Sequence, residues 1–222
     1  MSGLRGNDMD KEGAHQVVRM FQRISAAINV EKGRLSELDG AIGDADHGIT
    51  MARGFSAVTK RLSGVDCETS LPSDIFRIAA STFLDSVGAS TGPLYATAFA
   101  DAAQALAGKE SLGPCEQADI VEAVKSGIKR RGKGDRGDKT MLDAWIPAAE
   151  AARDARQRNR TAVEMWEQVL AAARTGCEST KSMIAARGRA LRLGERSLGH
   201  IDPGAASAVI IIAAMKDSFT ET

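Results

Sequence analysis

The chain has 222 residues, a length that suggests one domain or at most two small ones. Its 43% apolar residues are enough to bury a sizeable core, and its 29 basic and 29 acidic residues leave no net charge. A neutral chain is a poor candidate for coating nucleic acid or for binding acidic membranes over a broad face. Aromatic residues make up only 4% and alanine is abundant, which favours close-packed helices over a large β-sheet.

Apolar residues recur at helical spacing along the chain, from the stripe that begins at Val17 to the stretch between Ala205 and Met215. That last stretch is too short to span a membrane and is predicted to be a buried helix. We predict eight helices, at about residues 11–30, 47–63, 74–87, 93–107, 116–130, 138–156, 161–187 and 203–218. They form a single domain over residues 11–218, between a flexible N-terminus at residues 1–10 and a C-terminal tail at residues 219–222.

Two further features concern the cellular compartment. Three scattered cysteines, Cys67, Cys115 and Cys177, form no CxxC pair, which is typical of reduced thiols in a cytosolic protein. Residues 1–13 are polar and lack the apolar run of a signal peptide. The sequence therefore predicts a cytoplasmic protein.

The connections between the predicted helices are of two kinds. Those after the second, fourth and sixth helices are ordinary polar turns. Those after the first, third, fifth and seventh are rich in glycine, hydroxyl and carboxylate groups, at residues 39–48, 88–93, 132–138 and 194–204. In an up-and-down antiparallel bundle these four connections share one end, where four helix N-termini favour anions. The predicted fold is an all-α, eight-helix antiparallel barrel or bundle with its binding site at that end.

The first of these connections contains three aspartates within a span of eight residues, Asp39, Asp44 and Asp46. Carboxylates so close together repel one another unless a cation lies between them. All-oxygen ligands suit Mg²⁺ or Mn²⁺, and magnesium usually keeps phosphate oxygens in its shell. Any single aspartate is better explained as a helix cap. The three together predict a metal site that serves a phosphate ligand.

The second and third of these connections can serve as helix caps or as ligand contacts. Ser90 or Thr91 is predicted to cap the fourth helix or to contact phosphate, with Pro93 at the first helical position. Residues 132–140 resemble a P-loop, but Asp138 stands where that motif needs lysine, so Asp138 is predicted to cap the sixth helix. Lys139 is then a surface or structural charge, and the basic run at residues 129–133 is solvated.

The fourth connection ends in Asp202-Pro203-Gly204, which is typical of an N-cap, a first helical residue and a glycine that admits a close neighbour. His200 beside it is predicted to be a hydrogen-bonded structural residue. His47 lies next to the aspartates and is assigned a ligand contact, because imidazole is an unusual magnesium ligand.

Four motifs in order, at residues 42–48, 86–94, 137–141 and 193–204, resemble the L subunit, the nucleotide-binding half, of the dihydroxyacetone kinase family. The resemblance covers about residues 11–218 and implies an eight-helix antiparallel barrel that binds ADP or ATP through two Mg²⁺ ions. It implies that the metal ligands are Asp39, Asp44 and Asp46, which act in catalysis through the metal together with Arg189. The implied nucleotide contacts are His47, Gly48, Ile49, Thr50, Ser90, Thr91, Gly132, Met141, Arg189, Asp202, Pro203 and Gly204. Met141 suits either an adenine slot or an ordinary place in the core.

The resemblance also implies a phosphotransferase whose short ketose sits on a separate K subunit. The phosphoryl source is either ATP or a phosphohistidine protein of the sugar phosphotransferase system that rephosphorylates bound ADP. A homodimer or hetero-oligomer is expected, with no nucleic acid or membrane partner. Thr50 stands where the family's better-known members have asparagine. Two alternatives stay open: a kinase for another acceptor, such as a four-carbon ketose or an acyl carboxylate, and a non-catalytic nucleotide sensor that binds a transcription regulator.

Overall fold

The computed structural model describes residues 12–88 and 90–221, and all regular structure over these residues is helical. Its α-helices are α1 (Glu12–Ile42), α2 (His47–Leu62), α3 (Pro72–Ser86), α4 (Thr91–Ala105), α5 (Pro114–Gly132), α6 (Leu142–Gln157), α7 (Ala162–Ser179) and α8 (Pro203–Thr220). Two 3₁₀ segments, η1 (Thr180–Ser182) and η2 (Arg189–Ser197), follow α7. None of the described helices is long and apolar enough to cross a membrane.

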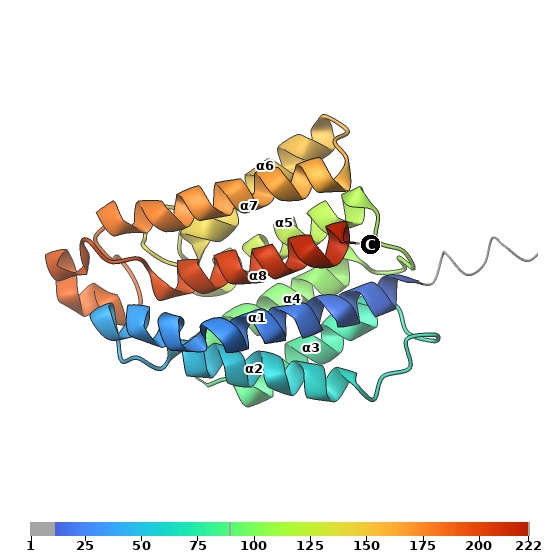
Figure 1. Ribbon diagram of the computed structural model, residues 1–222, viewed down its shortest axis with the longest axis horizontal. Coiled ribbons are helices and arrows are strands. Elements are labelled where there is room, and N and C mark those ends of the chain that lie inside the picture. The colour runs from blue at the N-terminus through green and yellow to red at the C-terminus, as the bar shows by residue number, and fades with distance from the viewer. Residues whose placement is uncertain (1–11, 89, 222) are drawn as a thin grey trace, which may run out of the picture.

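The helices form a closed antiparallel ring, as the sequence predicted. Each helix packs against the next one in the chain, and α8 returns to pack against α1. Figure 1 shows the helices along the long axis of the molecule, with η2 at one end and the C-terminus of α8 at the other. The connections that enter α2, α4, α6 and α8 therefore meet at the end that carries η2.

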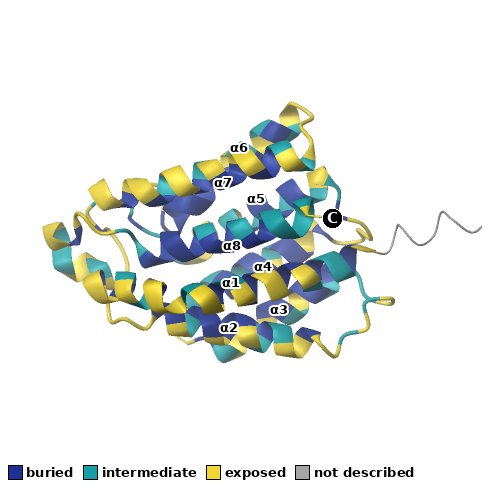
Figure 2. Ribbon diagram, in the orientation of Figure 1, coloured by how far each residue is buried: buried dark blue, intermediate teal, exposed yellow. Residues whose placement is uncertain are grey.

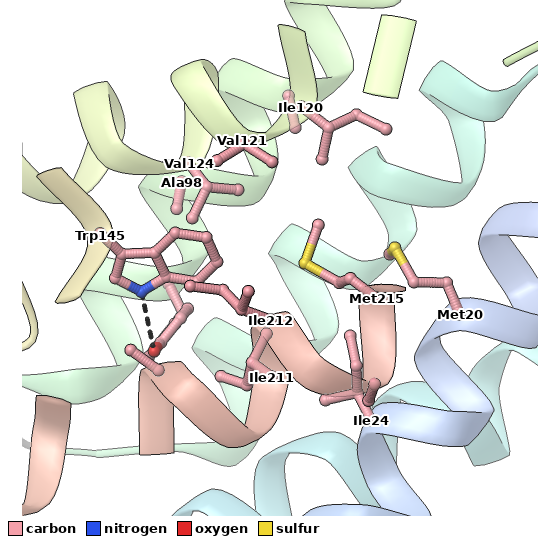
Figure 3. Packing of buried hydrophobic residues seen from close by; sticks show 14 of the residues in the cluster. Met20, Ile24, Ala98, Ile120, Val121, Val124, Trp145, Ile211, Ile212 and Met215 are labelled. Carbon is pink, nitrogen blue, oxygen red and sulfur yellow. Dashed lines mark hydrogen bonds between the residues drawn. The ribbon is translucent and has the colours of Figure 1, made fainter. Parts of the chain in front are cut away.

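The core fills the inside of this ring along its whole length (Figure 2). On the side of α1 to α4 it holds a cluster of aromatic rings, among which Phe99 meets Phe21 and Phe83 edge to face with centroids 5.3 Å and 5.7 Å apart. Elsewhere Trp145 packs among aliphatic side chains of α5 and α8 (Figure 3). The stretch from Ala205 to Met215 lies in this core, which confirms its prediction as a buried helix.

Several predicted helix limits were wrong. Helix α1 continues to Ile42, so Asp39 lies on its last turn and not in a loop. Helix α4 begins at Thr91, which makes Pro93 its third residue. Helix α7 ends at Ser179 rather than at residue 187. Helix α8 includes part of the predicted tail, and the predicted flexible residues 1–10 lie outside the described residues.

The start of α8 confirms its prediction from the Asp-Pro-Gly motif. The Asp202 carboxylate accepts a 2.7 Å hydrogen bond from the Ala205 amide, and Pro203 is the first helical residue. A Cβ at Gly204 would lie 3.0 Å from Oδ2 of Asp202, so glycine leaves room for the capping carboxylate. Burial raises the pKa of Asp202 to about 7, and the bond from Ala205 only partly offsets this.

We predict that Asp202→Asn makes the free energy of unfolding less dependent on pH. The folded pKa of about 7 lies above the ordinary value of 3.8, so the folded state retains a proton that the unfolded state has released between these values. Stability contributed by Asp202 therefore falls as the pH rises through that window. Asparagine keeps the cap but does not titrate.

The test is urea unfolding at about pH 5 and about pH 8. Asp202→Ala, the control, should lose about 1 kcal/mol through the missing cap. Equal pH dependence in wild type and Asp202→Asn would contradict the assignment.

Candidate functional site

A cavity of about 710 Å³ lies where the four glycine-rich connections meet. Its lining draws on the α1–α2 connection, the start of α4, the α5–α6 connection, the segment that leads into η2, and the start of α8. The prediction that these four connections share one end of the barrel is therefore confirmed. The lining combines charged residues with apolar ones, among them Ile42, Leu94, Ile128 and Leu142.

The three aspartates of the first connection lie together, and two of them, Asp39 and Asp46, line the cavity. One carboxylate oxygen from each of Asp39, Asp44 and Asp46 lies within 4.8 Å of the other two. Asp39 is buried, and its Oδ2 accepts hydrogen bonds from the amides of Asp46 (3.0 Å) and His47 (3.2 Å). Asp39 thus anchors the start of α2, while Asp44 and Asp46 remain exposed. An all-oxygen group with two open carboxylates fits a hard divalent cation such as Mg²⁺.

Arg189, the fourth residue predicted to act in catalysis, reaches the same place from η2. Its Nη1 forms an ion pair with Asp44 and lies 3.4 Å from an oxygen of Asp46. This brings a cation to carboxylates that would otherwise repel one another. The guanidinium is also well placed to bind an anion that approaches the aspartates, since half of the side chain is exposed.

His47 lines the cavity from the first turn of α2. Its Nε2 lies 2.9 Å from the Ser207 hydroxyl of α8. Burial lowers the pKa of the His47 imidazole, and the nearby charge of Asp39 opposes that shift. The ring is therefore expected to be neutral at neutral pH, which suits the contact role assigned to it.

Most of the predicted nucleotide contacts line the cavity, namely His47, Thr50, Ser90, Thr91, Gly132, Met141, Arg189, Asp202, Pro203 and Gly204. The described lining does not include Gly48 or Ile49. A Cβ at Gly48 would lie 1.9 Å from the Lys32 carbonyl oxygen, so this glycine allows α2 to pack closely on α1. Ile49 is 63% exposed. Met141 belongs to the core and also lines the cavity, so both of its predicted roles are compatible with the structure.

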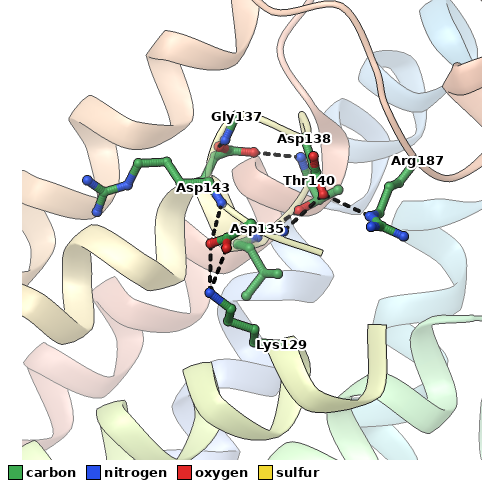
Figure 4. A network of polar contacts seen from close by, with 9 residues as sticks. Lys129, Asp135, Gly137, Asp138, Thr140, Asp143 and Arg187 are labelled. Carbon is green, nitrogen blue, oxygen red and sulfur yellow. Dashed lines mark hydrogen bonds and ion pairs between the residues drawn. The ribbon is translucent and has the colours of Figure 1, made fainter. Parts of the chain in front are cut away.

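The predicted cap of α6 was wrong, whereas Ser90 stands at the N-cap position of α4 as predicted. Within the described residues, however, neither Ser90 nor Thr91 makes a capping hydrogen bond with its side chain. Asp138 lies in the loop before α6, where it pairs with Arg187 (Nε to Oδ2, 2.8 Å) and accepts a bond from the Asp135 amide (Figure 4). The Arg187 guanidinium lowers the pKa of Asp138. Asp143 supports the loop instead, because its carboxylate accepts bonds from the amides of Gly137 and Thr140.

Four cationic residues of the lining were missed, namely Arg53, Arg131, Lys139 and Arg187. Lys139 was predicted to be a surface or a structural charge. It is only 1% exposed, so the structural role is the correct one. Its Nζ donates 2.5 Å bonds to the carbonyl oxygens of Thr180 and His200, and burial lowers its pKa. Arg53 follows Thr50 by three residues on α2, so helical spacing was the signal that could have identified it.

Known proteins resemble this chain over most of its length. The chain matches the DAK2 domain over residues 41–217. It is 38% identical to the PEP-dependent dihydroxyacetone kinase ADP-binding subunit DhaL of Escherichia coli, over 89% of this chain and 93% of that protein. It is 35% identical to the corresponding subunit of the PTS-dependent enzyme of Lactococcus lactis, over 87% and 92%.

Longer proteins also match. The L-erythrulose kinase of Pectobacterium atrosepticum is 28% identical over 92% of this chain, which spans only 35% of that protein. The crystal structure of the dihydroxyacetone kinase of C. freundii with AMP-PNP and Mg²⁺ aligns with a TM-score of 0.68 at 24% identity, over 98% of this chain and 37% of the solved chain. This last likeness shows the fold alone. The domain match and the identity to full-length subunits establish the family: the chain belongs to the DAK2 domain family.

Proposed function

We propose that the chain is the nucleotide-binding subunit of a dihydroxyacetone-type ketose kinase in the cytoplasm. It holds ADP or ATP with Mg²⁺ in the cavity and transfers a phosphoryl group to a short ketose on a separate K subunit. The observation that carries this proposal is the meeting of Asp39, Asp44, Asp46 and Arg189 at one side of a large cavity. Phosphoryl transfer depends on charge neutralisation and positioning more than on covalent chemistry by the protein.

The charges of the lining suggest how a nucleotide would lie. Phosphate oxygens need a cation between themselves and the aspartates, and two Mg²⁺ ions held by the three carboxylates would supply it. Arg189 and the amides at the starts of α2 and α8 would bind further phosphate oxygens. Apolar residues of the lining, such as Met141 and Leu142, would take the adenine ring.

The names of the relatives favour one phosphoryl source. Subunits that this chain matches over most of their length belong to PEP-dependent or PTS-dependent kinases. We therefore propose that ADP stays bound and is rephosphorylated by a phosphohistidine protein of the phosphotransferase system. A four-carbon ketose is the second candidate acceptor, because two L-erythrulose kinases contain a matching region. The chain spans only about a third of those proteins, and its identity to them, 28% and 32%, is below the 38% and 35% shared with the dihydroxyacetone kinase subunits, which favours the first candidate.

The first prediction of this proposal is that ADP binding requires a divalent cation. Without it the nucleotide phosphates face three carboxylates. Calorimetric titration with ADP should show affinity in Mg²⁺ at least about tenfold above that in excess chelator. Equal affinities would refute the metal-bridged arrangement.

The second prediction is that Asp44→Asn lowers kcat by at least about 100-fold, measured with the K subunit and its phosphoryl source. The substitution removes a charge that is expected to hold the metal but keeps the side-chain size. Because the Asp44–Arg189 pair is exposed, the melting temperature of the nucleotide-free protein should change little.

Asp154→Asn is the matched control. Asp154 and Asp44 are both 46% exposed and both pair with an arginine, but Asp154 does not belong to the group of three aspartates. The control should retain wild-type kcat. Near wild-type turnover of Asp44→Asn would refute its metal role, whereas loss of activity with an unfolded apo protein would indicate a structural one.

A further inference from the structure

Behind His47, a chain of polar side chains crosses the core. Trp145 on α6, Tyr95 on α4 and Ser207 on α8 are each fully buried, and the chain ends at His47 on α2, which lines the cavity. Figure 3 shows the Trp145 hydrogen bond among the surrounding apolar side chains. Polar groups in such a place are costly unless their hydrogen bonds are made, so the direction of each bond can be worked out.

The direction is fixed first at Trp145. An indole N–H can only donate, so the Tyr95 hydroxyl oxygen, 3.5 Å from Nε1, is the acceptor. The hydrogen of the Tyr95 hydroxyl therefore points away from Trp145.

Ser207 fixes the direction of the remaining bonds. Its Oγ lies 2.9 Å from the Gly204 carbonyl oxygen, which has no hydrogen to share, so the Ser207 hydrogen lies on that bond. The Ser207 hydroxyl therefore has no second hydrogen to donate. It can only accept a further bond, and its lone pairs are available to His47 Nε2, which lies 2.9 Å away.

We propose that Ser207 is a positioning residue that holds His47 in the Nε2–H tautomer, so that His47 Nδ1 accepts a hydrogen bond from an O–H group of the bound ligand. Nε2 must donate to Ser207, and in a neutral ring this leaves the lone pair on Nδ1. Phosphate oxygens are themselves acceptors, so Nδ1 is unsuited to them. The matching donor is a nucleotide hydroxyl or an ordered water. The ligand half of this inference rests on the proposed function, whereas the tautomer does not.

The tautomer can be measured in the nucleotide-free full-length protein by long-range ¹H–¹⁵N correlation of the imidazole rings. The chain has three histidines, and His47→Gln identifies the signals of His47 by their loss. We expect the pattern of a neutral ring protonated at Nε2. A ring protonated at Nδ1 at about pH 8.5, where an imidazole of ordinary pKa is neutral, would overturn the proposal.

Two variants separate positioning from general support of the core. Ser207→Ala removes the acceptor and should give a mixture of tautomers. Tyr95→Phe removes a buried hydroxyl of the same chain but leaves the His47–Ser207 bond, so the Nε2–H pattern should persist. An unchanged pattern in Ser207→Ala would overturn the role of Ser207. If Ser207→Ala does not fold, the tautomer of His47 in the wild type and in Tyr95→Phe still tests the proposal.

Titration with ADP and Mg²⁺ tests the ligand half. Ser207→Ala should weaken binding by roughly three- to tenfold, the worth of one hydrogen bond, and Tyr95→Phe should not. Unchanged affinity despite an altered tautomer would overturn the contact through Nδ1. If 2′,3′-dideoxy-ADP loses affinity in wild type but not in Ser207→Ala, the donor is a ribose hydroxyl; equal losses in both indicate water. Failure of wild type to bind ADP would instead refute the proposed function.

Discussion

Antiparallel closure of the helix ring is the constraint on which the site depends. Because α8 packs against α1 and successive helices alternate in direction, the connections into α2, α4, α6 and α8 must end at the same place. Residues as far apart in sequence as Asp39 and Asp202 thereby line one cavity. The same closure brings the N-termini of four helices to one end, where their free amides favour an anionic ligand.

Charged side chains gather at that end of the barrel, because burying them in the apolar core would be costly. Asp39 is buried, and one of its carboxylate oxygens accepts hydrogen bonds from the amides at the start of α2. Its position is therefore fixed before any ligand binds. Asp44, Asp46 and Arg189 are more exposed and free to rearrange. A rigid buried carboxylate beside two adaptable ones is a suitable arrangement for a cation that must also bind phosphate.

Local signals in the sequence predicted much of this. Helical spacing identified the eight helices, and the Asp-Pro-Gly motif correctly placed the start of α8, because its cap is made within four residues. The predictions failed where contacts with distant segments of the chain determine the role of a side chain. Asp138 pairs with Arg187 and so does not cap α6, and Lys139 is buried because it bonds to carbonyl oxygens of residues 180 and 200. Residues 180 and 187 come from a segment that was predicted as the end of the seventh helix, and residue 200 comes from the connection predicted after it.

The central proposal is that the three carboxylates bind divalent cations together with the nucleotide. Counting Mn²⁺ bound to the ADP complex, from the loss of the free-ion signal in electron paramagnetic resonance, tests this most directly. Two ions per chain are expected in wild type, with fewer in Asp39→Asn, which removes the buried ligand. Equal metal binding by wild type and Asp39→Asn, or none beyond what ADP binds alone in solution, would contradict it.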